Sequence, residues 1–119
     1  MTLSVWLPWP VAALSPNSRS HWSVKALAVK NARHDARILA MDAMKAVPVV
    51  YLPYEIPVLV TFVPNRKLHA YDYDNAQASL KAYSDGIADA LGVNDARFRY
   101  TYIHEGWQDE AGIHFAIGD

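Results

Sequence analysis

The chain has 119 residues, of which 52% are hydrophobic and 19% charged, and a net charge of −1; this is the balance of one ordinary globular domain spanning residues 1–119. It contains no cysteine, which excludes disulfides and thiolate chemistry and fits a cytoplasmic protein. Residues 1–14 are apolar, but Pro8 and Pro10 interrupt them and no basic segment precedes them, so we expect neither a signal peptide nor a membrane span.

The near-neutral total conceals an uneven distribution of charge. Residues 1–50 carry six Lys and Arg against two Asp, whereas residues 51–119 carry five Lys and Arg against ten Asp and Glu. A basic part that holds phosphates beside an acidic part that holds metal is what a metal-dependent nuclease requires. A solvated charged face explains the basic half equally well.

The first 22 residues predict a strand and a polar loop. Apolar residues alternate over residues 2–7, which predicts a strand that Pro8 ends. The loop that follows contains Asn17, Arg19 and His21, whose side chains suit hydrogen bonds to phosphate oxygens. An ordinary polar turn is the alternative interpretation of this loop.

Residues 23–46 predict a long helix with Ser23 as its N-cap. The stripe that we expect to be buried comprises Val24, Leu27, Ala28, Ala32, Ala36, Leu39 and Ala43. Another face carries a basic ridge, within about 60° around the helix, which comprises Lys30, Arg33, His34 and Arg37. The ridge faces either DNA or solvent. His21 and His34 are not paired at ligand spacing, so we do not expect them to bind metal.

Prolines at 48, 53 and 57 predict an irregular connection or edge strand over residues 47–57, and the apolar run 58–63 predicts a central strand. Arg66 and Lys67 follow, in a segment suited to binding phosphates or to a solvated loop. Near the end of the chain, alternation predicts strands over 98–104 and 113–117, joined as a hairpin by residues 105–112. We interpret His104 and His114 as strand residues with satisfied side chains.

Residues 75–91 predict one helix, because apolar residues recur at intervals of three and four. The expected buried positions are Ala76, Leu80, Tyr83, Ile87 and Leu91. Asp74, Lys81 and Asp85 share the opposite side, within roughly 20° of a common line. Gly86 in the helix interior costs about 1 kcal/mol relative to Ala, which helix stability does not explain. Gly92 is the expected residue just beyond the helix end.

Asp72 and Asp74 have two interpretations. In the first, Asp74 is the N-cap of the helix and Gln77 completes a capping box. In the second, Asp72 and Asp74 project the same way from an extended segment and Asp95 approaches from the far end of the helix. Three such carboxylates repel one another unless a cation is present, and oxygen ligands favour Mg²⁺ or Mn²⁺ over Zn²⁺.

The central segment resembles the RusA family of Holliday-junction resolvases. The resemblance rests on Asp72-Tyr-Asp74-Asn75, Lys81, Asp85-Gly86 and the ending Ala90-Leu-Gly-Val-Asn94-Asp95, and on the opening segments Leu7-Pro-Trp-Pro10 and Ser15-Pro-Asn-Ser-Arg19. It implies that Asp72, Asp74 and Asp95 bind a catalytic Mg²⁺ and that Lys81 assists. Asn94 departs from the family, which has an aspartate there, and Lys81 follows Asp74 at a longer spacing than usual.

Together these patterns predict an α+β domain, RusA-like, with a mixed sheet and two main helices packed against it. The resemblance adds a homodimer with two sites, which suits paired cuts in a four-way junction. The expected function is Mg²⁺-dependent cleavage of branched DNA, with phosphate contacts from Asn17, Arg19, Lys30, Arg33, Arg37, Arg66 and Lys67. The alternatives are a non-catalytic junction-binding protein, in which Asn94 marks a decayed site, and a small phosphohydrolase, which the absence of a Gly-rich phosphate loop disfavours.

Overall fold

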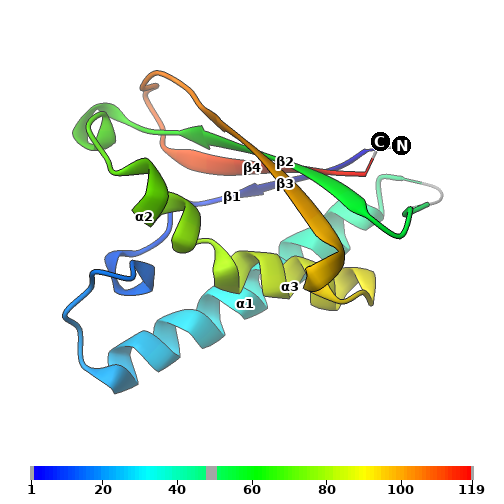
Figure 1. The fold of residues 1–119 in the computed structure, drawn as a ribbon, viewed down its shortest axis with the longest axis horizontal. Helices are drawn as coiled ribbons and strands as arrows, with labels where there is room; N and C mark the ends of the chain where they lie inside the picture. Colours follow the sequence, from blue (N-terminus) through cyan, green and yellow to red (C-terminus); the bar gives the residue numbers. More distant parts are fainter. Residues whose placement is uncertain (1, 48–50, 119) are drawn as a thin grey trace.

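The computed structural model describes residues 2–47 and 51–118, and it confirms an α+β domain with a mixed sheet and two main helices. In Figure 1 the sheet forms one layer and the two long helices lie together on one side of it. The strands are β1 (Leu3–Leu7), β2 (Ile56–Val63), β3 (Phe98–His104) and β4 (Gly112–Ile117). The helices are α1 (Trp22–Met44), α2 (Tyr73–Ala78) and α3 (Lys81–Leu91). Within the described ranges, no helix has the length and apolar character needed to cross a membrane.

The strand order is β1-β4-β2-β3, with β4 antiparallel to both of its neighbours and β2 parallel to β3. The predicted hairpin of the last two strands is therefore wrong. The reason lies in burial: Ile113, Phe115 and Ile117 are fully buried and require neighbours on both sides, whereas most of β3 is exposed and lies at the sheet edge. The parallel pair β2 and β3 is joined through α2 and α3, the crossover that parallel strands need.

In each strand of the sheet, every second side chain points toward the helices. The pattern is clear in β1, where Leu3, Val5 and Leu7 are buried while Ser4 and Trp6 are exposed. β2 lies between β4 and β3, as predicted for a central strand, although its outer face includes the partly exposed Leu59. The core therefore occupies a single layer between one face of the sheet and the helices.

The helix α1 buries small residues rather than the large ones predicted. Ala32, Ala36 and Ala40 are buried. Val24, Leu27 and Leu39 of the predicted stripe are exposed instead, Leu27 at 58%. Alanine allows α1 to approach α3 closely, so the longer side chains on either side of this seam remain outside it. The N-cap is also shifted from the predicted Ser23: the ring of His21 accepts a hydrogen bond from the Ser23 amide.

The predicted helix 75–91 is two helices, with a break at Ser79 and Leu80. The Ser79 hydroxyl donates a hydrogen bond to the carbonyl of Asn75, which supplies the backbone with a local partner at the break. The predicted inner stripe is confirmed, because Ala76, Leu80, Tyr83 and Ile87 are all buried and Leu91 packs against the core. Gly92 ends α3 in the left-handed conformation, with φ of +69°, as expected.

Candidate active site

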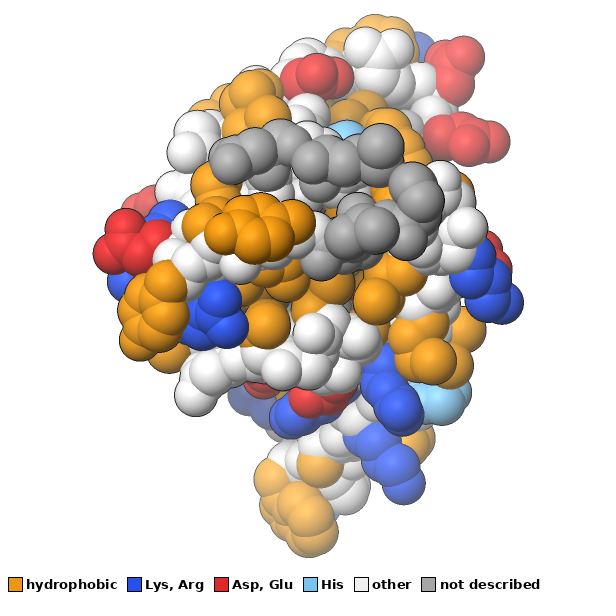
Figure 2. Space-filling model, turned by 90° about the vertical axis from the view of Figure 1, so that its right-hand side faces the viewer, with side chains coloured by type: hydrophobic (Ala, Val, Ile, Leu, Met, Phe, Trp, Pro, Cys, Tyr) orange, Lys and Arg blue, Asp and Glu red, His pale blue; other side chains and the backbone are white. Residues whose placement is uncertain are grey.

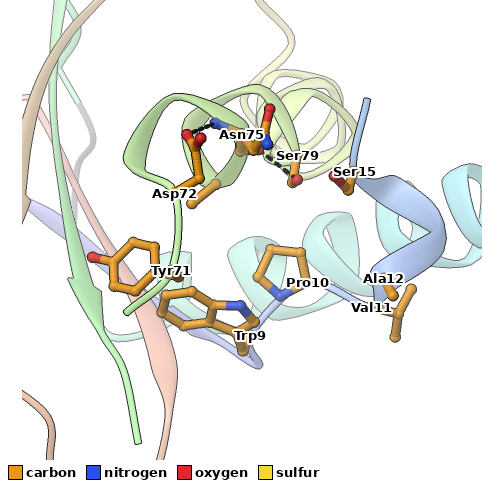
Figure 3. Close-up of a pocket in the computed structure, with 10 residues that line it drawn as sticks. Trp9, Pro10, Val11, Ala12, Ser15, Tyr71, Asp72, Asn75 and Ser79 are labelled. Carbon is orange, nitrogen blue, oxygen red and sulfur yellow. Dashed lines mark hydrogen bonds between the residues drawn. The ribbon is translucent and has the colours of Figure 1, made fainter. Parts of the chain in front are cut away.

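The first part of the candidate site is the start of α2, which carries Asp72 and Asp74. Asp72 is the N-cap, and its carboxylate accepts a hydrogen bond of 3.0 Å from the amide of Asn75 (Figure 3). The prediction of Asp74 as the N-cap is therefore wrong, because the N-cap lies two residues earlier, at Asp72. Asp74 lies in the first turn of α2, where a negative charge is favourable. The two carboxylates were expected to lie on one extended segment, but that segment ends at Asp72.

The second part is a charged cluster around Lys81, the first residue of α3. The Lys81 ammonium donates a hydrogen bond of 2.9 Å to Asp85, one turn further along the helix, and another to Asp95, which lies beyond the helix end. The lysine side chain is mostly exposed, and both carboxylates are more buried than it is. Residues far apart in the chain thus form one polar cluster at the surface.

The charges in this cluster stabilise one another. The hydrogen bond from Lys81 lowers the pKa of Asp95 below its ordinary value, with burial acting in the opposite direction. The hydrogen bonds to Asp95 and Asp85 raise the pKa of Lys81 above its ordinary range. The ammonium and the Asp95 carboxylate are therefore both charged at neutral pH.

Asn94, which departs from the acidic residue of the RusA pattern, has a structural role here. It is the N-cap of a short 3-10 turn, η3 (Asp95–Arg97), and its side-chain oxygen accepts a hydrogen bond of 2.9 Å from the amide of Ala96. An aspartate would make the same bond, because Asn and Asp are both good N-cap residues. Compared with the RusA pattern, Asn94 therefore keeps the cap but places no negative charge beside Asp95.

The chemistry of Asp72, Asp74 and Asp95 fits a hard divalent cation, since all three offer carboxylate oxygens. Their arrangement fits less well. Across residues 2–47 and 51–118, no three Asp, Glu, His or Cys side chains are grouped so that they could hold a metal ion. Asp95 instead bonds Lys81, and Asp72 bonds the backbone of α2. The structure thus brings Lys81, Asp85 and Asp95 together, but does not bring the three predicted ligands together.

Beside α2 lies a cluster of aromatic rings that the sequence analysis missed. The ring of His104 is stacked between Tyr73, at 3.7 Å between centroids, and Phe62, at 4.5 Å. Tyr71 tilts against both His104 and Tyr73. The signal was present in the sequence: tyrosines flank Asp72 on both sides, and His104 ends the alternating strand 98–104.

Both nitrogens of His104 have partners. Nδ1 lies 2.5 Å from the hydroxyl of Tyr71, and Nε2 lies 3.0 Å from the side-chain nitrogen of Gln77. An amide nitrogen only donates, so Nε2 accepts and Nδ1 carries the proton, which is the neutral form of the ring. Burial lowers the pKa of His104 and raises the pKa of Tyr71 to about 12, so both groups are uncharged near neutral pH. The expectation of a satisfied strand histidine is confirmed for His104.

A pocket of about 200 Å³ lies next to Asp72, and Figure 3 shows residues that line it. Trp9 and Tyr71 form one wall, and their rings meet edge to face at 4.8 Å between centroids. The opposite wall is α2, with Asn75 and Ser79. The loop after β1 closes the pocket, so the opening segment that contains Trp9 lies against the start of α2.

The predicted phosphate-binding residues lie in three places. Asn17 and Arg19 are exposed in the loop before α1, and Arg66 and Lys67 are exposed on the 3-10 turn η2 (Arg66–Leu68). On α1, Lys30 and Arg37 are exposed, but Arg33 forms two hydrogen bonds of 2.6 and 2.9 Å with Asp89 of α3. Figure 2 shows Lys and Arg side chains gathered on the lower part of its face, at the level where α1 lies in Figure 1.

Comparison with known proteins finds a relative but no matching family. No family model matches the chain. The chain is similar to an uncharacterized protein of Xylella fastidiosa (strain Temecula1 / ATCC 700964), with 41% identity over 95 residues. The match covers 80% of this chain and 61% of the Xylella protein, so the chain spans less than two thirds of that relative.

Proposed function

We propose that this chain is a Mg²⁺-dependent endodeoxyribonuclease of the RusA kind, which cuts phosphodiester bonds in branched DNA. The observation that carries the proposal is the contact between Lys81 and Asp95. The RusA resemblance assigns this lysine and this aspartate to one catalytic centre. Their hydrogen bond joins the first residue of α3 to the segment that follows α3. The Asp-Tyr-Asp-Asn segment at the start of α2 precedes Lys81 by a few residues.

In this proposal Asp72, Asp74 and Asp95 are the side chains that would hold the metal. A bound Mg²⁺ would activate the attacking water and stabilise the leaving 3′ oxygen. Lys81 contributes a fixed positive charge, because its raised pKa keeps the ammonium protonated over the physiological range. That charge is suited to the negative charge that develops on the scissile phosphate, while Asp85 orients the lysine from within α3.

The substrate would be a Holliday junction, and the active form a homodimer in the cytoplasm. Two identical sites related by a two-fold axis match the paired cuts that a four-way junction needs. The exposed apolar side chains of α1, among them Trp22, Leu27 and Ile38, support an assembly that covers part of this helix. The exposed basic residues Arg19, Lys30, Arg37, Arg66 and Lys67 would contact the phosphates.

The test is cleavage of a synthetic four-way junction and of a matched linear duplex, in Mg²⁺ and in Mn²⁺. We expect the wild-type protein to cut the junction. We expect Asp74→Asn to abolish cutting and to bind the junction about as tightly as wild type, because cutting needs the metal ligand and binding depends on phosphate contacts. Asp42→Asn is the matched control, since Asp42 is an exposed aspartate of α1 whose charge pairs with Lys45 at 3.7 Å. Wild-type cleavage rates for Asp74→Asn would refute the proposal.

A second candidate function is a junction-binding protein without nuclease activity. Two observations favour it: Asn94 replaces an acidic residue, and Asp95 is already bound by Lys81. This candidate predicts salt-sensitive binding to the junction and no cleavage in either metal. A nicked product in Mn²⁺ would exclude it.

A further inference from the structure

The feature that carries a further inference is a stack of three rings whose outermost ring is open. Phe62 lies at the inner end and is completely buried; His104 is parallel to it within 9°. Tyr73 is parallel to His104 within 2°, and it is 52% exposed. His104 covers one face of the Tyr73 ring. Tyr71 packs against that ring at 5.0 Å between centroids, but it also lies 5.6 Å from His104, so it is beside the stack and the face of Tyr73 opposite His104 stays open.

The stack is held rigidly. Phe62 belongs to the central strand β2, and His104 is the last residue of the neighbouring strand β3. Tyr71 and Gln77 each hydrogen-bond one nitrogen of His104, which fixes the plane of its ring. Tyr73 therefore packs on a ring that is fixed before any ligand binds, which lowers the loss of conformational freedom when a ligand stacks on Tyr73.

The charges around Tyr73 select the kind of group that can stack there. Tyr73 lies between Asp72 and Asp74, whose carboxylates repel a phosphate but do not repel a flat uncharged ring. The exposed Arg66 and Lys67 lie on η2, a few residues earlier in the chain, where they can contact a phosphate backbone. An aromatic face together with basic residues that track the backbone is the combination by which proteins bind unstacked nucleobases.

We propose that the open face of Tyr73 stacks on an unpaired nucleobase at the branch point of DNA. The proposal rests on the proposed function, since it names the part of the branched substrate that this site contacts. In a continuous duplex both faces of each base are covered by neighbouring base pairs, whereas bases at a branch point can be exposed. Stacking on Tyr73 therefore favours branched DNA over linear duplex.

The test is equilibrium binding without divalent metal, so that no strand is cut. The ligands are a four-way junction, the same junction with abasic residues at its four branch-point positions, and a linear duplex. The proteins are the wild type, Tyr73→Leu, which keeps apolar bulk on His104, and Tyr73→Phe, which keeps the ring. Tyr51→Leu is the matched control, because Tyr51 is 77% exposed and precedes β2. The first residue of β2, Ile56, pairs with Phe98, which is at the other end of β3 from His104.

We expect Tyr73→Leu to weaken binding to the intact junction by roughly 5- to 150-fold, the range measured for removal of one stacking ring. On the abasic junction we expect Tyr73→Leu and the wild type to bind equally. Tyr73→Phe and Tyr51→Leu should match the wild type on every ligand. Thermal unfolding checks that each variant is folded.

The outcomes separate the two proposals. If Tyr73→Leu binds the intact junction as tightly as wild type, or loses as much affinity for the abasic junction, the stacking inference is wrong and the proposed function stands. If the wild type binds the junction no more tightly than linear duplex, the stacking inference is wrong, and cleavage of the junction in Mg²⁺ or Mn²⁺ still decides the proposed function. Stacking without cleavage in Mg²⁺ or Mn²⁺ would keep the stacking inference and refute the nuclease.

Discussion

The α-carbon of Gly86 in α3 lies against the backbone carbonyl of Arg33 in α1. A β-carbon at Gly86 would lie 2.2 Å from that oxygen and 2.9 Å from the β-carbon of Ala36, closer than real β-carbons approach other atoms. The absence of a side chain at Gly86 thus permits the close packing of α1 and α3. This contact explains a glycine in a helix interior, where it costs about 1 kcal/mol relative to alanine.

We expect Gly86→Ala to lower the free energy of unfolding by about 1–3 kcal/mol, because overpacking outweighs the gain in helix propensity. Urea unfolding of the variant and the wild type measures the difference. Gly106→Ala is the control, since a β-carbon there meets no atom within 4 Å. A Gly86→Ala protein as stable as the wild type would contradict the close approach of the two helices.

Substitutions at Asp72 can separate its capping role from its proposed role as a metal ligand. Asp72→Ala should lower the free energy of unfolding by about 0.5–2 kcal/mol, because the Asn75 amide loses its partner. Asp72→Asn should preserve stability, since Asn caps helices as well as Asp does, and should still abolish cleavage of a four-way junction in Mg²⁺. Unfolding and cleavage are measured on the same preparations. An Asp72→Asn protein that retains wild-type cleavage would leave Asp72 with the capping role alone.

The ion pair between Arg33 and Asp89 predicts unequal contributions from the basic residues of α1 to DNA binding. Lys30→Ala and Arg37→Ala should each weaken binding to a four-way junction and reduce the slope of log Kd against log salt by about 0.9 per lost phosphate contact. Arg33→Ala should change that slope less, because its guanidinium is engaged by Asp89. Binding titrations at several salt concentrations measure the slopes. Equal slopes for all three variants would show that Arg33 leaves Asp89 when DNA binds.

The lowered pKa of His104 predicts a pH-dependent stability. Below the ordinary histidine pKa of about 6.5 the unfolded chain takes up a proton that the folded chain resists, so the free energy of unfolding falls as pH falls. Tyr71, with a pKa raised to about 12, stays neutral throughout this range, and Gln77 and Phe62 carry no titratable group. Urea unfolding between pH 7.5 and 5 should show a steeper loss for the wild type than for His104→Gln. His114 is present in both proteins, so its contribution cancels; parallel pH profiles would contradict the prediction.

Local patterns predicted the elements well. The alternation of residues 2–7 gave β1 to within one residue, and the inner stripe from Ala76 to Ile87 is buried as expected. These features depend on the period of a strand or helix, which the sequence displays directly. The predicted stripe of α1 was partly wrong because its burial is decided by how closely α3 approaches, and that distance depends on Gly86, far away in the chain.

Long-range partners were predicted poorly. The hairpin of the last two strands was wrong because strand pairing depends on which edges of the sheet remain open, and periodicity carries no information on that. The RusA resemblance grouped Lys81 with Asp95, which lie in contact, but gave no indication of the stack on His104. Connection 47–57 was predicted as irregular or edge strand; residues 48–50 of it lie outside the described ranges, and the rest is irregular up to Ile56, where β2 begins.

The position of β4 determines when the sheet can be completed during synthesis. Among the described residues β1 pairs only with β4, so β1 has no strand partner until β4 has left the exit tunnel of the ribosome. Such distant pairing slows folding, since a long loop must close before the contacts between β1 and β4 form. A chain truncated before residue 112 would therefore retain the β2–β3 pair and its crossover helices but would leave the edges of both β1 and β2 open to aggregation.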